Sequence, residues 1–174
     1  YISNHSSGKQ GYLIAEEFAK HGAEVILVSG PVSLKPPNKV NLYNVSTADE
    51  MLEICSKCLP VDIAVFVAAV ADWKVEKQYP GKIKKKNNSM TLNFEKNPDI
   101  LQYISNHKMR PNLVVGFSAE TEKIEENSRK KLIQKGCDWI LGNVVGKKTG
   151  VFGSDNNQII FISEKNIEKW PKLY

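Results

Sequence analysis

A run of small and polar residues near the start of the chain is the first candidate for chemistry. Residues 3–11 read Ser-Asn-His-Ser-Ser-Gly-Lys-Gln-Gly and lead into a helical pattern. Small residues let a ligand approach the backbone, and a helix N-terminus offers free N–H groups to an anion. The run matches neither a P-loop nor a complete dinucleotide-binding pattern. On these residues alone, Ser6, Ser7 and Gly8 form either a phosphate site or a tight turn with a helix cap.

A second candidate follows the most apolar run of the chain, residues 62–67. The sequence Ala68-Ala69-Val70-Ala71-Asp72 leaves room for a flat base or a ribose, although dense packing explains alanines equally well. Asp72 suits a ribose hydroxyl, a magnesium ion or the cap of a turn. Magnesium usually takes one or two carboxylates together with substrate phosphates. We therefore expect no metal held by protein ligands alone, and Mg²⁺ bound through nucleotide phosphates.

Lysines provide the candidate partners for phosphate groups. Four of them lie within residues 82–86, where Lys82 is suited to neutralise charge that develops at a phosphate. Lys131 and Lys135 are four positions apart, which places both on one helix face. The alternative for each lysine is an ordinary solvated face.

Composition narrows the class of protein. The chain has 174 residues, 41% of them hydrophobic, and a net charge of +5, which fits one globular domain. No apolar window has the length of a membrane span, and no aromatic residues interleave with the lysines, so we expect neither membrane nor nucleic-acid partners. Three cysteines make no disulfide framework and suit the cytoplasm. The Cys55-Ser56-Lys57-Cys58 spacing is isolated, and we interpret it as structural.

The elements that must position these residues alternate between helix and strand. Helices are expected over residues 10–21, from the Thr47–Glu50 capping box to about Cys58, from Asn97 as N-cap, and over 122–135. Strands are expected at 24–28, 40–45, 62–67, 113–117 and 138–141, with an edge strand at 158–162. This order predicts an α/β fold with a doubly wound, mostly parallel, Rossmann-like sheet. The continuous apolarity of 62–67 predicts burial on both faces.

Residues 73–96 interrupt that order. Alternating apolar and polar residues on both sides of Asn87-Asn88 predict a basic β-hairpin inserted after a central strand. Such a hairpin is a candidate lid.

Taken together and in order, these pieces resemble one family, the bacterial phosphopantothenoylcysteine synthetases. That family is the synthetase half of a bifunctional enzyme whose other half is a flavin-dependent decarboxylase. The resemblance covers essentially the whole chain and rests on six collinear motifs: Ser3–Gly8, Ala68–Asp72, Lys82–Lys85, Lys96–Ile100, Val115–Thr121 and Ser154–Asn157.

The resemblance implies a single phosphopantothenate–cysteine ligase domain over residues 1–174 that acts in coenzyme A biosynthesis. The carboxylate of 4'-phosphopantothenate would attack CTP to give an acyl-cytidylate and pyrophosphate, and L-cysteine would then displace CMP. It also implies that the family's first strand is missing from this chain, as in an N-terminally truncated domain. Family members dimerise, so a homodimer or a higher oligomer is expected. FMN is expected only if a decarboxylase domain is fused upstream.

The resemblance also assigns roles to residues. Asn4 and Lys82 correspond to catalytic positions, and Ser6, Ser7 and Gly8 to the substrate loop. The positions that correspond to nucleotide contacts are Phe66, Val67, Ala68, Asp72, Lys82, Asn97, Pro98, Asp99, Ile100, Phe117, Lys131 and Lys135.

Two other classes of protein stay open on the residues themselves. An NAD(P)- or nucleotide-binding Rossmann oxidoreductase or binding protein would have a complete glycine pattern and an acidic residue after its second strand, where this chain has Ser29 and Gly30. A non-catalytic interaction domain would not require Asn4 or Lys82. The preference for CTP over ATP rests on the bacterial resemblance, because eukaryotic relatives use ATP.

Overall fold

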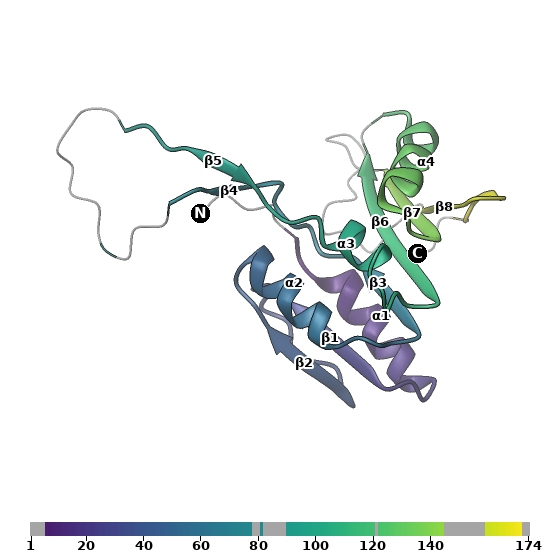
Figure 1. Ribbon diagram of the computed structural model, residues 1–174. Helices are drawn as coiled ribbons and strands as arrows, with labels where there is room; N and C mark the ends of the chain where they lie inside the picture. Colours follow the sequence, from purple (N-terminus) through teal and green to yellow (C-terminus); the bar gives the residue numbers. More distant parts are fainter. Residues whose placement is uncertain (1–5, 78–80, 82–89, 121, 145–158, 172–174) are drawn as a thin grey trace.

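The computed structural model describes residues 6–77, 81, 90–120, 122–144 and 159–171. This part of the chain contains four helices and nine strands, and Figure 1 shows their arrangement. The helices are α1 (Lys9–Lys20), α2 (Ala48–Lys57), α3 (Ile100–Ser105) and α4 (Ile124–Lys135). The strands are β1 (Val25–Ser29), β2 (Val40–Asn44), β3 (Ile63–Phe66), β4 (Trp73–Val75), β5 (Phe94–Lys96), β6 (Leu113–Glu120), β7 (Trp139–Val144), β8 (Ile159–Ser163) and β9 (Ile167–Lys169).

The strands form an α/β architecture, as predicted, but its strand pairing is mixed, because three of the six described strand pairings are parallel and three are antiparallel. The largest sheet has the order β3-β6-β7-β8-β9, in which β3, β6 and β7 are parallel and β8 and β9 run antiparallel. Strands β1 and β2 form a separate parallel pair, and β4 and β5 an antiparallel pair. In a doubly wound sheet the first strand lies between the second and the fourth. Among the described strands, none pairs with both β1 and β3, and the missing first strand stays a prediction.

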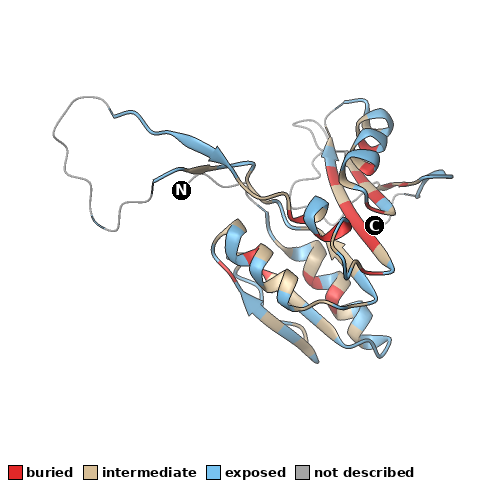
Figure 2. Ribbon diagram, in the orientation of Figure 1, coloured by how far each residue is buried: buried red, intermediate tan, exposed pale blue. Residues whose placement is uncertain are grey.

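The hydrophobic core has two parts that meet at the central strands. One part packs α4 onto the sheet through Leu132, Ile140 and Ile162, and the other joins α2 to α3 through Met51 and Ile104. Figure 2 shows buried residues gathered along β6 and the helices beside it. The side chain of Phe66 packs against both parts of the core, so β3 links them.

Local signals in the sequence specified several element boundaries correctly. The hydroxyl oxygen of Thr47 accepts a hydrogen bond from the backbone N–H of Glu50, and the Glu50 carboxylate reaches back to complete the capping box. Gly136 ends α4 in the left-handed conformation with a φ of 68°. The root of the predicted hairpin is present as the β4–β5 ribbon, whereas Asn87 and Asn88 lie outside the described residues.

Three predictions about the elements are wrong. Residues 62–67 are not buried on both faces, since no residue of β3 is fully buried and Ile63 is 42% exposed. Strand β8 is not at the edge, because β9 pairs along it. Helix α3 is capped by Asp99 and not by Asn97, because the Asp99 carboxylate accepts from the backbone N–H of Gln102 at 3.0 Å.

Gly116 on β6 generates a prediction about stability. A Cβ atom there would lie 2.7 Å from Leu101 Cδ2 and 2.8 Å from Ile140 Cδ1. Overpacking a core of this kind costs about 1–3 kcal/mol, so Gly116→Ala should lower the free energy of unfolding by that amount. Gly30→Ala is the matched control, since nothing lies within 4 Å of its added Cβ. Equal unfolding midpoints for the two variants in urea would contradict this packing.

Candidate functional site

The predicted loops meet at the carboxyl edge of the parallel strands. The N-terminal half of α1 reaches two of them: a Cβ on Gly11 would lie 3.7 Å from Val67 Cβ, just beyond β3. The amide of Asn143 on β7 donates to Gln10 Oε1 at 3.4 Å. The start of α1 therefore lies against the ends of β3 and β7, where open parallel sheets bind ligands.

The loop before α1 forms a tight turn. Gly8 has a φ of 71° and no side chain caps the helix. The Ser6 hydroxyl accepts from the Gly8 N–H at 3.3 Å, and the Ser7 hydroxyl accepts from the Lys9 N–H at 3.4 Å. A Cβ on Gly8 would approach Val32 Cγ1 to 2.8 Å, so glycine is required for both conformation and space. The turn is confirmed, and the role of this loop in binding phosphate stays a prediction.

A hydrogen-bonded clasp joins two of the predicted ligand segments. The side-chain amide of Asn97 donates to the carbonyl of Ala71 at 2.8 Å, and its backbone N–H donates to the carbonyl of Asp72 at 2.9 Å. These bonds hold residues 97–100 beside the end of the 68–72 segment. Ala68 and the carboxylate-bearing Asp72 are exposed there. Asn97 lies two positions before Asp99, the residue that caps α3, and its side chain bonds to Ala71 instead.

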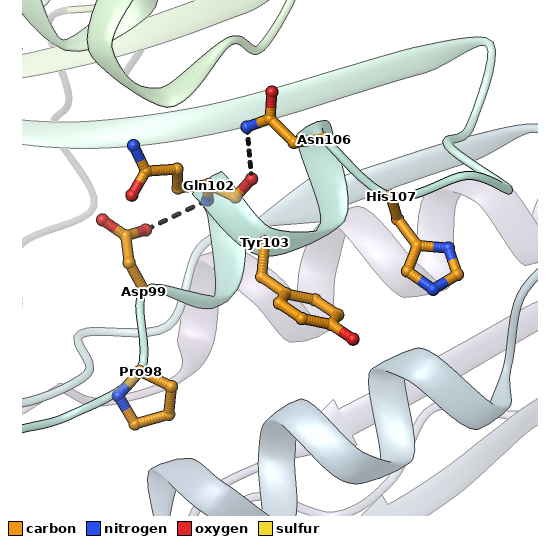
Figure 3. Close-up of a pocket in the computed structure, with 6 residues that line it drawn as sticks. All are labelled: Pro98, Asp99, Gln102, Tyr103, Asn106 and His107. Atoms are coloured by element: carbon orange, nitrogen blue, oxygen red, sulfur yellow. Dashed lines mark hydrogen bonds between the residues drawn. The ribbon is translucent and has the colours of Figure 1, made fainter.

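An open hollow of about 600 Å³ begins at this clasp and runs along α3. Figure 3 shows its lining: Pro98, Asp99, Gln102, Tyr103, Asn106 and His107. The rings of Tyr103 and His107 lie 5.7 Å apart, centroid to centroid. Neither ring is predicted as a site residue from the sequence, although aromatic rings four positions apart on a helix are expected to meet. The neighbouring Ile100 faces inward, and its side chain is part of the core.

Both predicted phosphate-binding lysines of α4 have carboxylate partners. Lys131 Nζ lies 2.7 Å from Glu120 Oε1 at the end of β6, and it also donates to the Ser118 hydroxyl at 3.2 Å. Lys135 forms an ion pair with Asp99. The side chains of Lys131 and Lys135 stay 40% and 23% exposed. Glu120 is not among the site residues predicted from the sequence, although it lies within one of the six motifs.

The predicted nucleotide-binding residues do not all lie on one side of the sheet. Gly116 faces the Leu101 side chain of α3, and Ser118 shares that face because side chains alternate along a strand. Phe117 therefore points to the opposite face from Ser118 and Lys131. Only at the strand ends, beyond Glu120, can one ligand reach both sides. Asn4, Lys82 and the Ser154–Asn157 motif lie outside the described residues.

The Glu120 carboxylate is held in its ionised form. Partial burial alone would raise its pKa, but hydrogen bonds from Lys131 and Ser118 outweigh that effect, and the pKa lies below the ordinary value of 4.5. The carboxylate also accepts from the side-chain amide of Asn127 at 3.3 Å. The described geometry thus maintains a charged pair, Glu120 with Lys131, next to the carboxyl edge.

Other chemistry receives no support from the described residues. Burial raises the pKa of Cys55 to about 11, so its thiol is a poor nucleophile near neutral pH. No three His, Cys, Asp or Glu residues among those described are grouped as metal ligands. None of the described helices has the length and apolarity to cross a membrane.

Comparison with known proteins places the chain in a defined group. Residues 1–174 match the family described as DNA/pantothenate metabolism flavoprotein, C-terminal domain. The coenzyme A biosynthesis bifunctional protein CoaBC of Escherichia coli K12 is 44% identical over 163 residues, which cover 91% of this chain and 40% of that protein. CoaBC of Haemophilus influenzae is 41% identical over 160 residues, with the same coverage. The chain thus spans about 40% of the length of these relatives.

A solved structure supports the same grouping. The crystal structure of the C-terminal domain of CoaBC has a TM-score of 0.81 and 33% identity, and the match covers 99% of this chain and 78% of that one. The shared architecture confirms the α/β fold.

The ionised Glu120 generates a prediction about pH. Because its folded pKa is below 4.5, the carboxylate stabilises the fold above about pH 4.5, and this contribution disappears as the pH falls below that value. Glu120→Gln should therefore lose less stability than the unmodified protein between about pH 6 and pH 3. Thermal denaturation across this range measures the difference, with Glu126→Gln as a control for an exposed carboxylate. An equal loss of thermal stability in the unmodified protein and in Glu120→Gln, as the pH is lowered over this range, would contradict the prediction.

Proposed function

Because the chain belongs to the family of DNA/pantothenate metabolism flavoprotein C-terminal domains, we propose that it is a ligase that joins 4'-phosphopantothenate to L-cysteine in coenzyme A biosynthesis. The observation that carries the proposal is that the described motif segments, residues 6–8, 68–72, 96–100 and 115–120, lie near the carboxyl edge, in a chain that matches the family over residues 1–174. The CoaBC relatives are named for this pathway, which supports the choice of substrates.

The proposed reaction has two steps. An oxygen of the phosphopantothenate carboxylate attacks the α-phosphorus of CTP, and the bond to the β-phosphate breaks to release pyrophosphate. The amine of cysteine then attacks the acyl carbon, loses a proton, and the C–O bond breaks to release CMP. Activation is needed because a free carboxylate has no good leaving group.

In this proposal the catalytic residues are Asn4 and Lys82. The Lys82 ammonium neutralises charge that develops on the α-phosphate, and the Asn4 amide donates to the oxyanion of the acyl-cytidylate step. The loop of Ser6, Ser7 and Gly8 binds the substrate phosphate at the start of α1.

The proposed nucleotide contacts come mainly from the two segments that Asn97 joins, residues 66–72 and residues 97–100. The backbone of Phe66 and Val67 with Ala68 would contact cytosine, and Phe117 would form a wall beside the base. The second segment, Asn97 to Ile100, supplies backbone groups and the Asp99 carboxylate. Lys131 and Lys135 would reach the nucleotide from α4.

Magnesium fits this arrangement through the nucleotide. Asp72 offers an exposed carboxylate next to the Asn97 clasp, and hard oxygen donors are the ligands that Mg²⁺ prefers. Asp72 with the phosphates of CTP would hold the ion, which would supply charge neutralisation at the phosphates.

The β4–β5 ribbon supports a homodimer as the working form. Figure 1 shows it extending away from the helices and the larger sheet. Trp73 lies opposite Lys96 and Val75 opposite Phe94, so the apolar Trp73, Val75 and Phe94 share one face with Lys96, where Trp73 is 49% and Phe94 41% exposed. The other face carries Lys74, which contacts Asp49 of α2 at 2.5 Å. A two-stranded ribbon is marginally stable alone, and a second copy of its apolar face would cover it.

The relatives are bifunctional and longer than this chain. If a decarboxylase domain precedes this one in the full-length protein, FMN belongs to that domain. The ligase domain itself would then need only CTP, its two substrates and Mg²⁺.

A coupled assay tests the proposed function directly. The full-length protein should form the amide from phosphopantothenate, cysteine and CTP, and more slowly or not at all with ATP. Lys82→Gln should reduce turnover by at least about 100-fold, because removal of one group that stabilises transition-state charge has this effect. Lys165→Gln, in the turn after β8, is the control. Stabilisation by NADH without any effect of CTP would contradict the function, and near-normal turnover by Lys82→Gln would contradict the role of that lysine.

The homodimer yields a separate prediction. Phe94→Asp places a charge on the apolar face of the ribbon and should raise the dimer dissociation constant at least about tenfold, since burying an unpaired charge is costly. Ile133→Asp is the control, because Ile133 on α4 is 78% exposed and lies away from the ribbon. Sedimentation velocity at several concentrations measures both. The dimer interface would lie elsewhere if Phe94→Asp sedimented like the unmodified protein.

A further inference from the structure

We propose that Glu120 is a positioning residue that fixes the ammonium of Lys131 for contact with the anionic groups of the nucleotide. This inference rests on the proposed function, because it assigns Lys131 to nucleotide binding. Neither the motif resemblance nor the comparisons give Glu120 a role.

The contact joins two elements through three polar groups. Glu120 Oε1 lies 2.7 Å from Lys131 Nζ and accepts from the Ser118 hydroxyl at 2.8 Å. The Ser118 oxygen in turn accepts from Lys131 Nζ at 3.2 Å. The ammonium of α4 is therefore held at two points on β6, within a closed triangle of hydrogen bonds.

The carboxylate that anchors this triangle is itself fixed. Its second oxygen, Oε2, accepts from the side-chain amide of Asn127 at 3.3 Å, and the same amide donates to the carbonyl of Glu122 at 3.0 Å. The Glu120 side chain is only 16% exposed and Ser118 only 2%. Movement of Glu120 would break bonds to β6, to α4 and indirectly to the turn between them.

In this position the Lys131 ammonium can still donate one hydrogen bond to a ligand. A lysine ammonium has three N–H donors, and two of them point to Glu120 and Ser118. The third has no partner among the described residues, and the side chain is 40% exposed. A flexible lysine normally loses side-chain entropy when it binds an anion. Here that cost is already met in the free protein, so the remaining N–H can contact a phosphate or ribose oxygen without further ordering.

A neighbouring ion pair shows what an ordinary contact on this helix is like. Lys130 lies 2.6 Å from Glu126, four positions away on the same helix, with side chains 70% and 54% exposed. That pair connects α4 only to itself. The Glu120–Lys131 pair instead crosses from β6 to α4 at the carboxyl edge, where the ligand is proposed to bind.

Steady-state kinetics of the full-length protein test the inference. Glu120→Gln should raise the KM for CTP about three- to tenfold, the equivalent of releasing one ordered side chain, while the KM for cysteine stays unchanged. Glu126→Gln should leave both values unchanged. In a Lys131→Met background, Glu120→Gln should have no further effect on the KM for CTP, because Glu120 acts through Lys131.

The outcomes separate the inference from the function beneath it. If the unmodified protein forms no amide with any nucleotide, the proposed function fails. If it is active but Glu120→Gln behaves like Glu126→Gln, or raises the KM equally in the Lys131→Met background, only the inference fails. A lower KM in Glu120→Gln would also overturn it, because the carboxylate would then compete with the nucleotide. Should Glu120→Gln not fold, Ser118→Ala removes the other anchor of Lys131 and should raise the KM for CTP in the same direction.

Discussion

Parallel pairing of β6 with β3 on one side and with β7 on the other is the constraint on which the rest of the structure depends. It brings the ends of three strands to one edge, and α1 lies against two of them at Val67 and Asn143. Strand β6 can take this central place because Gly116 lets Leu101 and Ile140 close over it. Among the described residues, the loops with a proposed function at 6–8, 68–72 and 97–100 lie near that edge.

Features set by neighbours in the sequence were predicted well, and features set by distant contacts were not. The Thr47–Glu50 capping box and the glycine after α4 act within a few residues, so the sequence was sufficient. The cap of α3 was assigned to Asn97, whose amide instead bonds to Ala71, 26 positions away. The exposure of Ile63 depends on which strands flank β3, and periodicity carries no information about that.

The same distinction applies to the candidate site. Spacing alone placed Lys131 and Lys135 on one helix face, but it did not reveal that each meets a carboxylate from another element, Glu120 or Asp99. The site therefore has less free positive charge than a count of lysines suggests. Its cations are oriented by fixed partners, and orientation lowers the entropic cost of binding an anion. In the proposed reaction, contacts that are oriented and partly neutralised would bind a triphosphate and still allow CMP and pyrophosphate to leave.

The fate of one oxygen atom tests the central claim, that the carboxylate is activated as an acyl-cytidylate at this edge. When cysteine attacks the acyl carbon, the carboxylate oxygen that attacked CTP must leave with CMP. Phosphopantothenate labelled with oxygen-18 in its carboxyl group should therefore give CMP that carries one labelled oxygen, with no label in pyrophosphate, as read by mass spectrometry. Unlabelled CMP, or label in inorganic phosphate, would contradict the account.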